Sequence, residues 1–126
     1  LELSMRLRLV LMPVFLSFII SGVAHAQDGP VPGSEIQEKW VGKEMMGTTA
    51  NGAKVLMKLE TDGKASVTAG TTSDTGTWRA SEQGYCTTWS NIRAGQERCF
   101  TVTRSGNTMK VSNPDGSLGG YFTSIK

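Results

Sequence analysis

The fold is decided by the stretch KVLMKLETDGKASVTAG at residues 54–70. Apolar and polar residues alternate on both sides of a Thr-Asp-Gly turn, and the apolar set is Val55, Met57, Leu59, Ala65, Val67 and Ala69. A period of two places such a set on one face of a β-sheet, and Asp-Gly between two alternating runs is typical of a hairpin. The stretch therefore predicts an antiparallel hairpin with one dry and one wet face.

The same pattern continues through most of the chain. Strands are predicted at residues 43–49, 54–60, 64–70, 75–81, 85–90, 97–104, 108–113 and 118–125. Turn residues such as Asn51-Gly52 separate them, and the polar run at residues 71–74 is assigned to a connection. Eight short, evenly spaced strands are typical of a sandwich or a barrel.

Short connections between sequential strands favour one of these two architectures. We expect an all-β fold, an eight-stranded antiparallel up-and-down barrel, because closure removes both exposed sheet edges. A two-sheet sandwich remains the alternative. A short helix is predicted at residues 34–40, with Ser34 as its N-cap and Gln37 completing a capping box.

The first 26 residues carry the pattern of a cleavable export signal. Arg6 and Arg8 precede an apolar run at residues 9–20, and Ala-His-Ala at residues 24–26 is a small-x-small cleavage site. The run is shorter than the about 20 residues of a membrane-spanning helix. We expect a periplasmic or extracellular bacterial protein with no membrane span after cleavage.

The rest of the chain is predicted to form one domain. Residues 27–33 contain two prolines and two glycines and are predicted to be a flexible leader, followed by a single barrel domain over residues 34–126. Cys86 and Cys99 are predicted to form a disulfide, the default state in an oxidising compartment. A redox pair is the alternative, but it requires Cys-x-x-Cys spacing.

The charge and the residue composition of the chain argue against several classes of function. The formal net charge is +2 at pH 7 and charges of both signs alternate, which argues against nucleic acid as a partner. His25, the only histidine, leaves with the signal, so the usual base of a Ser or Cys triad and the histidine ligands of a zinc site are both missing. A pair of carboxylates for glycoside cleavage remains open. We expect a monomer that is not an enzyme and holds no metal or cofactor.

Aromatic residues supply the candidates for ligand contact. Tyr85 and Trp89 share the strand face opposite Cys86, so they point inward if the disulfide lies outside. Trp78 is expected at the barrel base or in the core and is a third candidate. Several inward positions are small, so a narrow apolar cavity is the alternative to a filled interior.

The loop at residues 91–96 is the candidate for protein contact. It is clamped by the predicted disulfide, and it offers Asn91, Ile92 and Arg93, with Arg98 nearby. An ordinary hairpin loop without function is the alternative.

Two groups of residues carry a resemblance to known families. A short helical segment, Trp-Val-Gly at residues 40–42 and Gly-Thr-Trp at residues 76–78 resemble lipocalin-type, calycin-like barrels. The segments at residues 84–89 and 97–100 are similar to small secreted proteins of alphaproteobacteria, which are largely of unknown function. The resemblance implies a fold and a compartment and transfers no catalytic residues.

Periplasmic inhibitors of C-type lysozyme are also similar in size and fold class. Their Ser-Gly-x-x-Tyr motif is not reproduced, because Ser105-Gly106 is followed by Asn107-Thr108-Met109. We expect an exported, non-enzymatic binding module that occupies a partner protein, as a hydrolase inhibitor would. The alternatives are a lipocalin-like carrier of a small apolar ligand and a structural cell-envelope protein.

Overall fold

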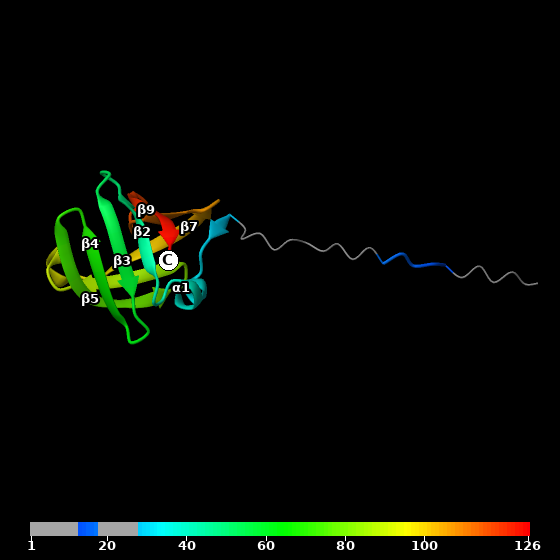
Figure 1. Ribbon diagram of the computed structural model, residues 1–126, viewed down its shortest axis with the longest axis horizontal. Coiled ribbons are helices and arrows are strands. Elements are labelled where there is room, and N and C mark those ends of the chain that lie inside the picture. Colours follow the sequence, from blue (N-terminus) through cyan, green and yellow to red (C-terminus); the bar gives the residue numbers. More distant parts are fainter. Residues whose placement is uncertain (1–12, 18–27) are drawn as a thin grey trace, which may run out of the picture.

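The computed structural model describes residues 13–17 and 28–126. Eight consecutive strands make up most of it: β2 (Glu44–Thr49), β3 (Lys54–Leu59), β4 (Lys64–Ala69), β5 (Thr72–Ser81), β6 (Gly84–Trp89), β7 (Arg98–Ser105), β8 (Thr108–Ser112) and β9 (Leu118–Ile125). Each strand pairs antiparallel with the next, and β9 returns to pair with β2 (Figure 1). The predicted up-and-down barrel is thereby confirmed over the sandwich.

The alternating apolar residues of the strands fill the barrel interior, as predicted. Met57 and Leu59 of β3 are at most 3% exposed, and Ala65 of the facing strand is 4% exposed. Val102 and Val111 occupy the corresponding positions on β7 and β8. The two-residue period therefore reports the inward face of each strand.

One strand begins earlier than the sequence pattern predicts. The sequence pattern predicts a connection at residues 71–74, but β5 already begins at Thr72, which pairs with Ala69. The turn is as short as Gly70-Thr71 because Gly70 takes a positive φ of 60°. As a result Asp74 lies within a strand and is only 9% exposed.

The segment before the helix is ordered, so the prediction of a flexible leader is wrong over residues 28–33. Gly29–Pro30 forms a short strand, β1, which pairs with Arg104 and Thr103 of β7. Val31 is fully buried, and its N–H donates to the Val102 carbonyl at 2.9 Å. The burial of Val31 and the pairing of β1 with β7 therefore hold this segment in place.

Helix α1 (Gly33–Lys39) begins one residue earlier than predicted, with Pro32 and not Ser34 at the N-cap position. The N-cap makes no side-chain hydrogen bond, so the predicted capping by Ser34 is wrong. Packing sets the start instead: a Cβ on Gly33 would lie 1.9 Å from the Ser81 carbonyl oxygen. Only glycine allows the helix to approach the β5–β6 hairpin this closely.

The predicted export signal at residues 1–26 lies outside the described residues, except for residues 13–17, which form no helix or strand. Within the described part of the chain, none of the helices has the length and apolar character to cross a membrane.

Candidate functional site

The barrel encloses an open cavity of about 530 Å³. It opens between the β2–β3, β6–β7 and β8–β9 hairpins, whose residues Asn51, Arg93 and Asn113 line its mouth. Helix α1 contacts the β5–β6 hairpin, which lies at the other end of an up-and-down barrel. The lining side chains are mainly apolar and include Val55, Met57, Val67, Trp89, Phe100 and Phe122.

Aromatic rings form the floor of the cavity and one side of its wall. Trp40 is fully buried, and its ring centroid lies 5.6 Å from that of Phe122 and 5.7 Å from that of Tyr85. Tyr85 in turn lies 5.4 Å from Phe100, its partner across the β6–β7 ladder. Burial raises the pKa of Tyr85 above its ordinary value, so its phenol stays neutral. These contacts close the α1 end of the barrel with packed rings.

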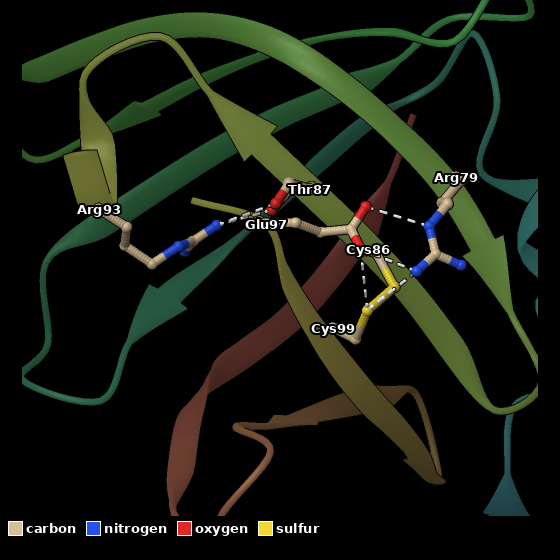
Figure 2. A network of polar contacts seen from close by, with 6 residues as sticks. All are labelled: Arg79, Cys86, Thr87, Arg93, Glu97 and Cys99. Atoms are coloured by element: carbon tan, nitrogen blue, oxygen red, sulfur yellow. Dashed lines mark hydrogen bonds and ion pairs between the residues drawn. A yellow bond between two sulfur atoms is a disulfide. The ribbon is translucent and has the colours of Figure 1, made fainter. Parts of the chain in front are cut away.

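The loop between β6 and β7 turns one cation inward over the cavity mouth. Arg93 lies in the short 3₁₀ turn η1 (Ile92–Gly95), and one terminal nitrogen donates to Thr87 Oγ1 at 2.9 Å (Figure 2). Its guanidinium carbon lies 5.3 Å from the centre of the Phe100 ring, within cation–π distance. Arg93 and Ala94 take positive φ angles of 55° and 52°, which is uncommon for residues other than glycine.

Asp74 holds the base of this loop in place. Its Oδ2 accepts the backbone N–H groups of Asn91 at 2.8 Å and of Ile92 at 2.9 Å, and its Oδ1 accepts that of Thr75. The bonds from Ile92 and Asn91 hold the pKa of Asp74 below its ordinary value, since they stabilise the charged form. A carboxylate on β5 therefore anchors the loop that carries Arg93.

The charge at the cavity mouth is positive. Arg93 and Arg98 are among the lining residues, whereas the lining, all of it in the described part of the chain, includes no Asp or Glu. Burial, followed by the charge of Arg98, lowers the pKa of Arg93 below its ordinary value. In the β8–β9 turn, hydrogen bonds from Ser117 hold the pKa of Asp115 below its ordinary value, and the charge of Arg98 adds a smaller effect in the same direction. The mouth thus presents two cations above an apolar interior.

The disulfide lies on the outer face of the barrel, as Figure 2 shows. Cys86 and Cys99 are direct partners across β6 and β7, as predicted. Beside them Arg79 donates to both carboxylate oxygens of Glu97, which holds the pKa of Glu97 below its usual range. Ligand atoms of Cys86, Glu97 and Cys99 lie within 4.8 Å of one another, but both sulfurs are bonded to each other and offer no thiolate.

The predicted ligand-facing residues divide between two places. Tyr85 and Trp89, 4% and 5% exposed, both line the cavity. Trp78 does not line it: its indole N–H donates to the Glu60 carbonyl at 2.8 Å, toward the α1 end of the barrel.

The predicted protein-contact residues also divide. Asn91 and Arg98 are exposed, whereas Ile92 packs partly against the core and Arg93 turns into the mouth. Sequence reasoning missed Asp74, whose only signal was an acid within a polar run.

No family model matches the chain, and no curated protein or solved structure is significantly similar to it.

Proposed function

We propose that this protein is an exported binding module that holds one small, largely apolar ligand inside its barrel. The observation that carries the proposal is the open cavity of about 530 Å³ with its mainly apolar lining. Small-molecule sites have volumes of about 300–1,000 Å³ and are lined mostly by apolar and aromatic side chains with a few polar groups. An eight-stranded barrel whose interior is not filled by side chains is suited to a single small ligand.

The arrangement of the wall supports reversible holding of a ligand. Trp89 and Phe100 give flat apolar contact surfaces, and Asn51 and Asn113 are polar residues of the lining at the mouth. Closed strand pairing around the whole ring keeps this wall in place without the ligand. A preformed cavity lowers the ordering cost of binding.

The partner-protein hypothesis receives less support. Two of the four loop residues on which it rested, Ile92 and Arg93, are directed toward the barrel and not toward a partner. The inhibitor and cell-envelope hypotheses stay predictions.

A titration of the purified protein with the neutral apolar dye N-phenyl-naphthylamine tests the proposal. We expect saturable dye fluorescence at a stoichiometry of one, with a matching change in tryptophan emission because Trp89 lines the cavity. Absence of saturable binding by this dye and by a second neutral dye would overturn the proposal.

A pair of neighbouring substitutions locates the dye. Val67→Phe fills the cavity from β4 and should weaken dye binding about tenfold or more, since the new ring occupies the ligand's space. Ser66→Phe adds the same ring to the exposed face of the same strand and should leave the affinity unchanged. Equal affinities in both variants would place the dye outside the barrel. Ala69→Phe serves in place of Val67→Phe if the latter fails to fold.

A further inference from the structure

An apolar ligand does not explain the side chain of Arg93, which lines the cavity. Its Nε is buried, and no hydrogen-bond acceptor lies within reach among the residues that the structure describes. Of its polar contacts, the bonds to the Thr87 hydroxyl and carbonyl involve neutral oxygens at 2.9 and 3.5 Å. A partly buried guanidinium without a carboxylate partner carries a desolvation cost that these contacts offset only in part.

Two other arginines of the described domain are each paired with an acidic side chain. Arg79 is paired with Glu97, and Arg104 with Glu35. Among the described residues, Arg93 and Arg98 make no salt bridge, and both line the cavity mouth. The two arginines of the described domain that make no salt bridge therefore both lie at the entrance of its cavity.

The loop that carries Arg93 positions its guanidinium at the cavity mouth. The backbone takes the left-handed conformation at both Arg93 and Ala94, which costs free energy at residues with a Cβ. Asp74 clamps the preceding amides, and the Phe100 ring supports the guanidinium from the barrel wall. This support places the guanidinium over the mouth before any ligand arrives.

We propose that the ligand is a single-chain amphiphile with a carboxylate head, which pairs with Arg93 at the mouth while its apolar chain lies in the barrel. This inference rests on the proposed function and adds the chemical class of the ligand. A carboxylate gives the terminal nitrogens of the guanidinium a charged acceptor, which the neutral oxygens of Thr87 do not provide. Arg98 adds a second favourable charge on the same rim.

The test compares displacement of N-phenyl-naphthylamine by dodecanoate and by its uncharged methyl ester, both below their micelle concentrations. Wild-type protein should bind dodecanoate roughly tenfold to a hundredfold more tightly than the ester, the range of a hydrogen bond to a charged group. Arg93→Met keeps an unbranched apolar side chain without the charge. It should lose this preference, so that dodecanoate no longer binds more tightly than its ester.

Arg79→Met is the matched control, because Arg79 lies on the outer face of the barrel and is paired with Glu97. It should retain the full preference for dodecanoate. Wild-type protein that binds the dye but shows no preference would overturn this inference and leave the proposed function standing. The same holds if Arg93→Met keeps the preference. Failure of the dye itself to bind would instead overturn the proposed function.

Discussion

Removal of the disulfide should cost this domain a large part of its stability. The Cys86–Cys99 bond joins residues separated by 13 positions and so closes a loop of about 14 residues. The loss of unfolded-chain entropy on closing such a loop stabilises the native state by about 3 kcal/mol. Domains of this size have unfolding free energies of about 5–15 kcal/mol. The double variant Cys86→Ala/Cys99→Ala should therefore remain folded but lose roughly a fifth to three fifths of its stability.

Urea unfolding followed by tryptophan fluorescence measures this loss. With a denaturant slope of about 1–3 kcal/mol per molar, the midpoint should fall by about 1–3 M. Dithiothreitol should bring the wild-type midpoint down to that of the variant and should leave the variant unchanged. Because the bond lies on the outer face, away from Tyr85 and Trp89, affinity for the neutral dye should change little.

A loss below about 1 kcal/mol at an unchanged slope would refute the entropic reasoning. It would mean that the unfolded chain between the two cysteines is already restricted. A changed slope would instead show that the bond alters how compact the unfolded chain is.

Two further perturbations test the anchoring of the loop and the packing of the strands. The pKa of Asp74 is lowered by its backbone bonds, so its stabilising effect is present above about pH 4 and is lost as the pH falls through the lowered folded value. Asp74→Asn should reduce by up to one the number of protons taken up on acid unfolding, measured from urea midpoints between pH 7 and pH 2.5; an unchanged proton uptake would contradict this. Gly76→Ala should cost about 1–3 kcal/mol in the same assay, because its Cβ would lie 2.0 Å from the Thr88 carbonyl oxygen. Thr77→Ala, at the exposed neighbouring position, should change stability by less than about 0.5 kcal/mol.

The sequence by itself determined the strands, their inward faces and the disulfide between two of them. The alternation in residues 54–70 is a local property, since residues two apart share a face in any strand. The turn residues limit the connections, and short connections between eight strands favour a closed meander. Cys86 and Cys99 could be placed opposite each other because a hairpin centred on one loop sets its own register. The inward direction of Tyr85 and Trp89 followed from the same period.

The tertiary structure decided the parts that depend on residues far apart in the chain. Asp74 is a strand residue that accepts the amides of residues 17 and 18 positions later, although its polar neighbours suggest a turn. Val31 is fixed by β7, which lies about seventy positions away. Arg93 points inward because a strained loop, a threonine hydroxyl and an aromatic ring meet at the barrel mouth. Hydrophobic periodicity carries no information on such polar contacts. Whether the side chains fill the barrel depends in turn on how all eight strands close around the interior.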